Sequence, residues 1–175
     1  MTVEGHHGLS CRNGSGKHSR HNQVNELLCR AFISTGTLAT REPHALCTSS
    51  GKRPDGVTQV AWRRGRCLAW DATCPDTYAS SHAQASSAQA GSAAATAELL
   101  KSQKYADIIA GVDFVPVAIE TSGVWGEQAA SLVKEVGRRI CAISHEPRST
   151  SYLRQRIAVA VQRFNAFCVL GTLTK

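Results

Sequence analysis

Apolar residues recur every three or four positions in four parts of the chain, and this spacing predicts four helices. The segments are residues 20–34, 93–109, 129–143 and 152–170. Such spacing puts the apolar side chains on one helix face, where they can pack against a core. Gly36 follows the first segment and is a typical stop signal. The Ala- and Ser-rich stretch 79–97 leads into the second segment, and its alanine content favours an earlier start of that helix.

Strands are predicted between these helices. Residues 38–41 form a short strand-like run, and VTQVAW at 57–62 alternates apolar and polar side chains. Gly65 marks a turn before CLAWDAT at 67–73, so these two runs predict a β-hairpin. FVPVAIE at 114–120 is typical of a buried strand. The order helix, three strands, helix, strand, helix, helix therefore predicts a single α/β domain with a mixed central sheet.

Length and composition predict one globular domain that is neither secreted nor inserted in a membrane. The chain has 175 residues, enough to bury a core, and no apolar run approaches the roughly 20 residues that cross a bilayer. Its first residues lack the apolar stretch of a signal peptide. Seven cysteines, an odd number, argue against a disulfide framework and favour a nuclear or cytoplasmic location. Cys29 and Cys168 lie in apolar helical patterns and are predicted to fill the core.

The formal charge of +7 is concentrated in two parts of the chain. Between residues 51 and 70 the only acid is Asp55, and between 138 and 163 the only acid is Glu146. Clustered positive charge favours an anionic partner, with nucleic acid as the leading candidate and a merely solvated surface as the alternative. From these stretches we assign to nucleic-acid binding Lys52, Arg53, Arg63, Arg64, Arg66, Arg138, Arg139, Arg154, Arg156 and Arg163.

Two aspartates on the predicted hairpin are the leading candidates for chemistry. Asp55 precedes the first strand, and Asp71 lies near the end of the second. Carboxylates on adjacent strands can converge on one hard cation, and Mg²⁺ takes one or two carboxylates together with water and phosphate oxygens. Such an ion activates water and stabilises charge on a phosphate. Taken alone, the spacing has an ordinary alternative, because Pro-Asp-Gly is a common turn sequence and Asp71 could simply end a strand.

Sequence blocks along nearly the whole chain carry a resemblance to a known family. The blocks are HGLSC, GKHSRHNQVNELLCRA, GKRPDGV, RGRCLAWDATCPDT, KSQKYADI, FVPVAIETSGVWG and QRIAVAVQRFNA. They resemble the C-terminal region of polyproteins from metazoan non-LTR retrotransposons, which lies downstream of the reverse transcriptase and is similar to a restriction-like endonuclease.

This resemblance implies a PD-(D/E)XK nuclease fold over residues 20–170, with an αβββαβ core and two C-terminal helices. It also implies that the domain nicks target DNA and so primes reverse transcription. The implied cofactor is Mg²⁺ or Mn²⁺. The implied partners are DNA, element RNA and the reverse transcriptase domain of the parent polyprotein.

The resemblance also assigns catalytic roles. Asp55 and Asp71 would be the metal-binding carboxylates. Thr73 stands where the parent fold has a lysine, and the retrotransposon nucleases resemble a variant whose lysine lies on the following helix, ahead of a tyrosine. Lys101 and Lys104 are therefore the candidate catalytic lysines, and their spacing of three lets both share a helix face. The alternative is an exposed lysine pair on a surface helix.

Two further elements are candidates, and in the first of them Arg20 and His21 are assigned to nucleic-acid binding. Arg20, His21 and Asn22 match the family's Arg-His-Asn element at the start of the first helix. A basic pair at a helix N-terminus favours a nearby anion, so we expect phosphate or the aspartates beside Arg20 and His21; the alternative is a solvent-exposed helix start. Glu120 is considered as an additional acid, with a structural, hydrogen-bonded carboxylate as the favoured interpretation.

Residues 1–19 resemble the remnant of a zinc hairpin and are predicted to form a disordered loop. His7 and Cys11 look like the second half of that hairpin. A structural zinc ion needs four ligands, and no Cys-x2-Cys precedes this pair, so we expect no stable zinc site. The chain would then be a fragment of a mobile element. The alternative function is a catalytically inactive, nucleic-acid-binding remnant of the polyprotein.

Overall fold

Helices lie on both faces of a small sheet. The computed structural model describes residues 7–10, 15–44, 46, 51, 53–106 and 111–173. Its helices are α1 (His7–Ser10), α2 (Ser15–Ser34), α3 (Ser80–Ala88), α4 (Ser92–Lys104), α5 (Glu127–Ser144) and α6 (Ser149–Leu173). Its strands are β1 (Ala39–Arg41), β2 (Gly56–Thr58), β3 (Leu68–Thr73) and β4 (Asp113–Ala118). None of the helices within the described residues is both long and apolar enough to cross a bilayer.

The four strands form one mixed sheet in the order β1-β2-β3-β4. β2 is antiparallel to both β1 and β3, whereas β4 runs parallel to β3. The predicted single α/β domain with a mixed sheet is confirmed. The register places Gly56 opposite Trp70 and Leu68 opposite Asp113. This register decides which side chains meet at each end of β3.

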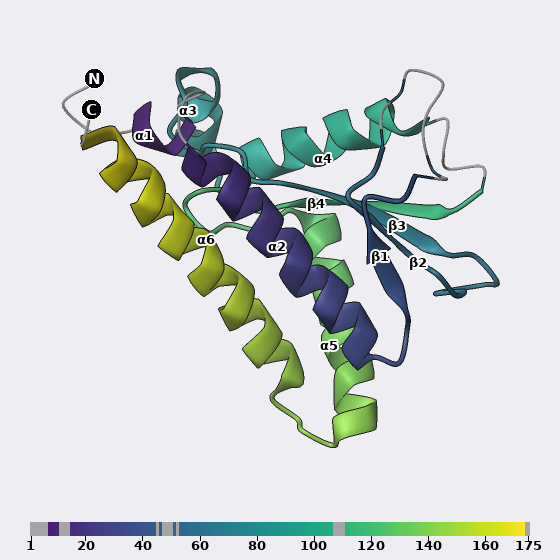
Figure 1. The fold of residues 1–175 in the computed structure, drawn as a ribbon. Helices are drawn as coiled ribbons and strands as arrows, with labels where there is room; N and C mark the ends of the chain where they lie inside the picture. The colour runs from purple at the N-terminus through teal and green to yellow at the C-terminus, as the bar shows by residue number, and fades with distance from the viewer. Residues whose placement is uncertain are drawn as a thin grey trace.

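The two faces of the sheet have different cores. α2 and α5 cover one face, with α6 packed on both of them, and α4 covers the other face (Figure 1). Side chains alternate along β3, so Trp70 packs toward α2 and stacks on Phe32 at 4.9 Å. Ala69 instead packs with Tyr105 on the opposite face. Asp71 follows the same alternation and therefore lies on the α4 side of the sheet.

Some helix boundaries differ from the prediction. The loop predicted over residues 1–19 is wrong for 7–10, which form α1, and for 15–19, which begin α2. α2 extends this far because Gly16 lets it pack closely on α6; an added Cβ would lie 2.6 Å from Cys168 Sγ. The Ala- and Ser-rich stretch divides into α3 and α4 at Gly91, whose φ of +87° is left-handed. α4 ends at Lys104, five residues before the predicted end.

β2 is also shorter than its predicted range of 57–62. The Thr58 hydroxyl accepts a hydrogen bond from the backbone N–H of Leu68 at 2.9 Å and donates to the carbonyl of Val60 at 2.8 Å. The side chain thus takes the place of a backbone partner, and regular pairing stops there. Trp62 nevertheless packs in the core against Phe32. The alternating pattern of residues 57–62 therefore indicates that Trp62 is buried, although the strand itself ends at Thr58.

Replacing Gly56 by alanine is expected to lower the free energy of unfolding by about 2–3 kcal/mol, because it overpacks the core. The added Cβ would lie 2.1 Å from the ring of Trp70, which is fully buried. Urea unfolding measures the loss. Gly171→Ala is the matched control, since nothing lies within 4 Å of a Cβ there. Equal losses in the two variants would contradict the close packing of Gly56 on Trp70.

Candidate functional site

Asp55 lies where β2 and β3 begin to separate. Gly56 pairs with Trp70, so the next position along β2 is Asp55 and the next along β3 is Asp71. Asp55 continues the pairing with its side chain, since its Oδ2 accepts a hydrogen bond from the backbone N–H of Ala72 at 2.7 Å. Register and this bond together hold the carboxylate at the open end of the hairpin.

The α2 helix supplies two further partners for Asp55. Oδ2 also contacts His21 Nε2 at 2.9 Å and accepts a hydrogen bond from Asn25 Nδ2 at 3.1 Å. Burial opposes ionisation of Asp55, but the hydrogen bonds and charge of His21 and the bonds from Ala72 and Asn25 outweigh it and lower its pKa. The hydrogen bond to Asp55 in turn raises the pKa of His21. Asp55 is therefore held as a carboxylate beside a ring that readily takes a proton.

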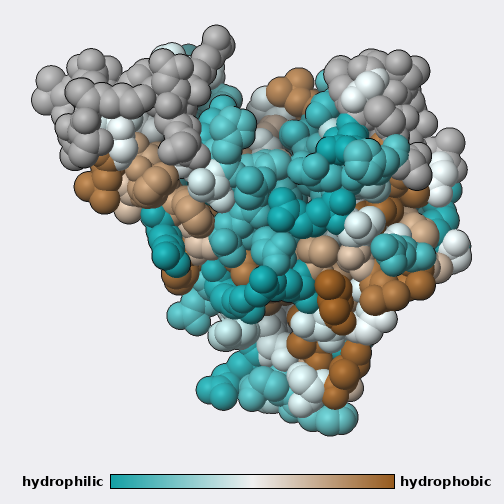
Figure 2. Space-filling view, viewed as in Figure 1, coloured by the Kyte–Doolittle hydropathy of each residue, from teal (hydrophilic) through white to brown (hydrophobic). Residues whose placement is uncertain are grey.

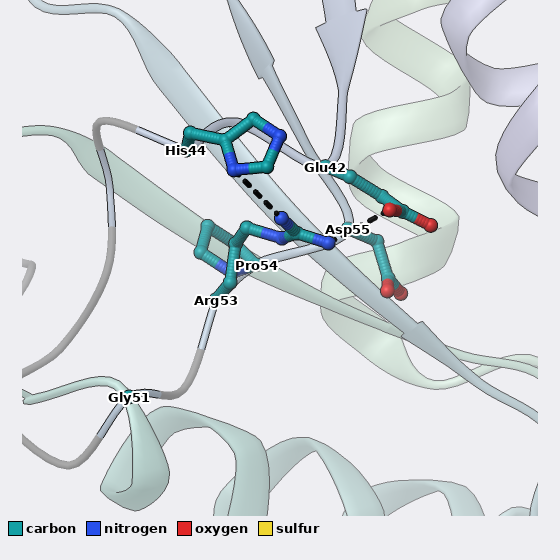
Figure 3. A pocket seen from close by; sticks show the side chains of 6 residues that line it. All are labelled: Glu42, His44, Gly51, Arg53, Pro54 and Asp55. Atoms are coloured by element: carbon teal, nitrogen blue, oxygen red, sulfur yellow. Dashed lines mark hydrogen bonds and ion pairs between the residues drawn. The ribbon is translucent and has the colours of Figure 1, made fainter.

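One oxygen of Asp55 is left for another ligand. Oδ1 accepts no hydrogen bond from any residue that the structure describes, and the side chain is 18% exposed. Asp55 lines a pocket of about 450 Å³ with Glu42, His44, Gly51, Arg53 and Pro54. Within it the Arg53 guanidinium lies between His44 and Glu42, 2.7 Å from a Glu42 oxygen (Figure 3).

Asp71 is the buried carboxylate of the pair, with a side chain 3% exposed. Its Oδ1 accepts a hydrogen bond from Lys101 Nζ. Its Oδ2 accepts one from the Tyr105 hydroxyl at 2.5 Å and lies 3.9 Å from Lys104 Nζ. Both candidate lysines thus converge on Asp71 from the last turn of α4, and they do not form the exposed surface pair of the alternative interpretation. Asp55 lies opposite Asp71 in the strand register and binds the backbone N–H of the next residue, Ala72, so the two carboxylates belong to one cluster.

Tyr105 completes the cluster and was not among the predicted site residues. Its hydroxyl accepts a hydrogen bond from Lys104 Nζ at 2.7 Å and lies 2.7 Å from the Arg53 carbonyl. Burial and the hydrogen bond to Asp71 raise the pKa of Tyr105, so the phenol keeps its proton. The KSQKY block, in which Tyr105 directly follows Lys104, contained the signal. Asn25 was also missed, although it lies one helical turn after His21.

Part of the predicted basic surface lies away from these carboxylates. Arg63 and Arg66 contact the Asp113 carboxylate at the start of β4, at 3.5 Å and 3.0 Å. Asp113 faces Leu68, three residues before Asp71, which corresponds to about 10 Å along the strand. Arg64 is exposed in the turn between Arg63 and Arg66. Lys52 lies outside the described residues. Among the described basic residues of this stretch, Arg53 alone is placed beside Asp55.

The arginines of α5 and α6 are spread over the helical layer. Arg138 and Arg139 both pair with Glu135, and Arg139 also lies over the Trp62 ring at 3.5 Å. Arg154 and Arg156 are exposed and lie over the rings of Trp125 and Tyr152 at 5.8 Å and 5.9 Å. Arg163 is exposed on α6. The second basic stretch is thus a helical surface, apart from the carboxylate cluster.

Arg20 is buried in the molecule, with 1% of its surface exposed. Its Nη1 donates to Asn165 Oδ1 at 2.6 Å and its Nη2 to the Leu9 carbonyl at 3.3 Å. The solvent-exposed helix start of the alternative interpretation is therefore wrong for Arg20. His21 meets the expectation of a nearby anion through its contact with Asp55.

The remaining candidates are structural or lie outside the described part of the chain. Glu120 is fully buried and accepts hydrogen bonds from the backbone of Ala94 and the hydroxyls of Thr77 and Ser122, as the structural interpretation expected. Cys29 and Cys168 are buried, as predicted. His7 begins α1, while Cys11 lies outside the described residues, so the zinc prediction stays untested.

No group of three or more His, Cys, Asp or Glu side chains that could hold a metal ion occurs among the residues of the described ranges. The chain matched no model of a known protein family and no curated protein sequence.

Proposed function

We propose that the chain is a metal-dependent DNA endonuclease domain that nicks one strand by hydrolysing a phosphodiester bond. The observation that carries this proposal is the cluster at the open end of the hairpin, where the carboxylates Asp55 and Asp71 lie at neighbouring positions of adjacent strands and Asp71 accepts a hydrogen bond from Lys101 of α4. The chain's resemblance to retrotransposon nucleases agrees with it. In this proposal the α2, β1–β3, α4 and β4 elements correspond to the αβββαβ core of the restriction-like endonucleases, and α5 and α6 are the two added helices.

The donor atoms suit a hard divalent cation. Carboxylate oxygens are the ligands that Mg²⁺ prefers, and it needs only one or two of them when water and phosphate complete the octahedron. Asp55 offers Oδ1, which has no hydrogen-bond partner among the described residues, and Asp71 offers Oδ1 if Lys101 moves aside. When bound there, Mg²⁺ or Mn²⁺ would supply activation of water and charge stabilisation on the scissile phosphate.

The lysines and Tyr105 would position the substrate. Lys101 is 23% exposed, so its ammonium can leave Asp71 and contact a nonbridging phosphate oxygen as a point charge. Lys104 stays beside the Tyr105 hydroxyl and adds positive charge behind the same phosphate. Tyr105 donates a hydrogen bond to Asp71 or to the Arg53 carbonyl and so fixes the buried carboxylate. These residues would orient the phosphate and hold Asp71 in place.

A second candidate function is nucleic-acid binding without cleavage. One observation favours it: both oxygens of Asp71 already have partners, Lys101 on one and Tyr105 on the other. A cluster locked in this way would keep its fold and positive charge but could not take a metal ion. Such a remnant would bind DNA with a steep salt dependence and leave it intact.

The chemistry of the nick tests the proposal. Priming of DNA synthesis requires that water attack the phosphorus and break the P–O3′ bond, which leaves a 3′-hydroxyl and a 5′-phosphate, the ends that a polymerase extends and a ligase seals. Plasmid nicked by the full chain in Mg²⁺ should therefore be resealed by DNA ligase and extended by a DNA polymerase without prior treatment. Nicks that ligase cannot reseal would contradict hydrolysis of the P–O3′ bond and the priming role proposed for the nick.

A further inference from the structure

A second pocket lies on the α2 side of the carboxylate cluster. It has a volume of about 420 Å³ and is lined by Lys17, His18, Arg20, His21, Thr73 and Cys74. Four of these six side chains carry or can take a positive charge, and none is acidic. α2 passes over the middle of the face shown in Figures 1 and 2, where the surface is mostly hydrophilic.

Arg20 gives this pocket an uncompensated buried charge. It is 1% exposed, yet its hydrogen-bond acceptors are neutral, the Asn165 side-chain amide and the Leu9 carbonyl. Its Nε is buried and has no hydrogen-bond partner within the described ranges. A buried guanidinium without an anion is costly, and proteins usually pair it. A group that could pair with Arg20 is therefore expected in the pocket it lines.

The pocket's own thiol cannot serve as that anion. Cys74 lies beside Arg20, and burial raises its pKa to about 11, so it remains a neutral thiol near pH 7. The first turn of α2 contains no acidic residue either, so the helix start adds positive potential to the same place. The four residues of the lining that carry or can take positive charge, Lys17, His18, Arg20 and His21, therefore favour an anion supplied from outside the chain.

We propose that this pocket binds a backbone phosphate of the DNA next to the one that is cut. The inference rests on the proposed function and specifies how the substrate would lie. His21 lines the pocket and contacts Asp55 Oδ2 at 2.9 Å, and Thr73 lines it two residues after Asp71. A phosphate held by Lys17, His18 and Arg20 would thus lie beside the carboxylate cluster. A duplex or single strand passing over α2 could fill both positions at once.

Inorganic phosphate is the first probe, because it tests the pocket without DNA, metal or catalysis. Titration into the full chain should shift the ring NMR signals of His18 and His21 saturably, and leave those of His82 and His145, which lie on α3 and after α5, unchanged. Lys17→Gln should weaken the phosphate affinity by about tenfold, the weight of one charge-assisted hydrogen bond. Lys17 is exposed, so this change leaves the core intact.

Lys134→Gln is the matched control, since it removes the same charge from an exposed position on α5. It should leave the phosphate affinity unchanged. Equal loss of phosphate affinity in both variants, or NMR shifts at all four histidines, would overturn the proposal. Either result would mean that phosphate is attracted by the overall positive charge and does not bind in this pocket. No shift at His18 and His21 would overturn the proposal as well.

DNA binding in EDTA extends the test to the substrate. Lys17→Gln should weaken binding of a short duplex and reduce the slope of log affinity against log salt by about one, whereas Lys134→Gln should change neither. Unchanged DNA affinity and slope in Lys17→Gln would overturn the proposal for DNA. Because neither measurement requires cleavage, a chain that binds phosphate here but never nicks DNA would refute the endonuclease and leave the anion pocket standing.

Discussion

Replacing Asp55 by asparagine is expected to reduce Mg²⁺-dependent nicking by at least about a thousandfold. The change removes the negative charge of the carboxylate whose Oδ1 is open to a ligand, and with it most of the attraction for a divalent cation. Losing about 4 kcal/mol of charge stabilisation in the transition state corresponds to this factor. Asparagine keeps an oxygen that can accept the Ala72 N–H, so the hairpin should stay paired. Nicking rates on supercoiled plasmid measure the effect.

Asp113→Asn is the control for this variant. Asp113 is also a partly buried carboxylate, 22% exposed against 18% for Asp55, but it pairs with Arg63 and Arg66 at the other end of β3. Its replacement should leave nicking within about a factor of two of the unmodified chain, since surface ion pairs contribute little. Comparable losses in the two variants would mean that Asp55 acts on folding rather than on the metal site, and thermal melts of both would show it.

Replacing Lys101 by methionine is expected to separate metal binding from catalysis. Nicking should fall by about a hundredfold, because the charge next to the scissile phosphate is lost. The Mg²⁺ concentration for half-maximal activity should decrease in the same variant, because Asp71 Oδ1 loses the cation with which the metal competes. Methionine retains most of the apolar stem of lysine, so packing on α4 is preserved. A Mg²⁺ titration of single-turnover nicking measures both effects.

Lys104→Met provides the comparison within the cluster. Lys104 Nζ lies 3.9 Å from Asp71 and donates to the Tyr105 hydroxyl instead, so its loss should change the Mg²⁺ requirement less than the loss of Lys101. Lys134→Met, on exposed α5, should change neither quantity. A higher Mg²⁺ requirement in Lys101→Met would contradict competition between the lysine and the metal for Asp71.

The sequence correctly predicted those parts of the fold and of the candidate site that follow from local patterns of residues. Helical periodicity identified the core face of α2, and the hairpin pattern placed Asp55 and Asp71 on neighbouring strands. The three-residue spacing of Lys101 and Lys104 correctly put both on one face of α4, in its last turn. These features follow from 3.6- and 2-residue repeats, which a single sequence contains.

The sequence was less informative where a contact joins distant segments. Arg20 is buried because α6 brings Asn165, 145 positions away, against its guanidinium. Arg63 and Arg66 are drawn to Asp113 because β4 pairs in parallel with β3, a register that no local pattern specifies. The described basic residues between positions 51 and 70 therefore lie in two places, at Asp113 and at Asp55. Arg53 alone among them lies beside Asp55.

The rate at which the full chain nicks supercoiled plasmid, followed as Mg²⁺ is titrated and then removed with EDTA, tests the endonuclease proposal most directly. We expect open circles to accumulate with increasing Mg²⁺, to stop forming in EDTA, and to be absent with Asp55→Asn at the same protein concentration. Salt-dependent binding of the plasmid without nicking at any Mg²⁺ or Mn²⁺ concentration would contradict the proposal and leave the chain as a nucleic-acid-binding remnant.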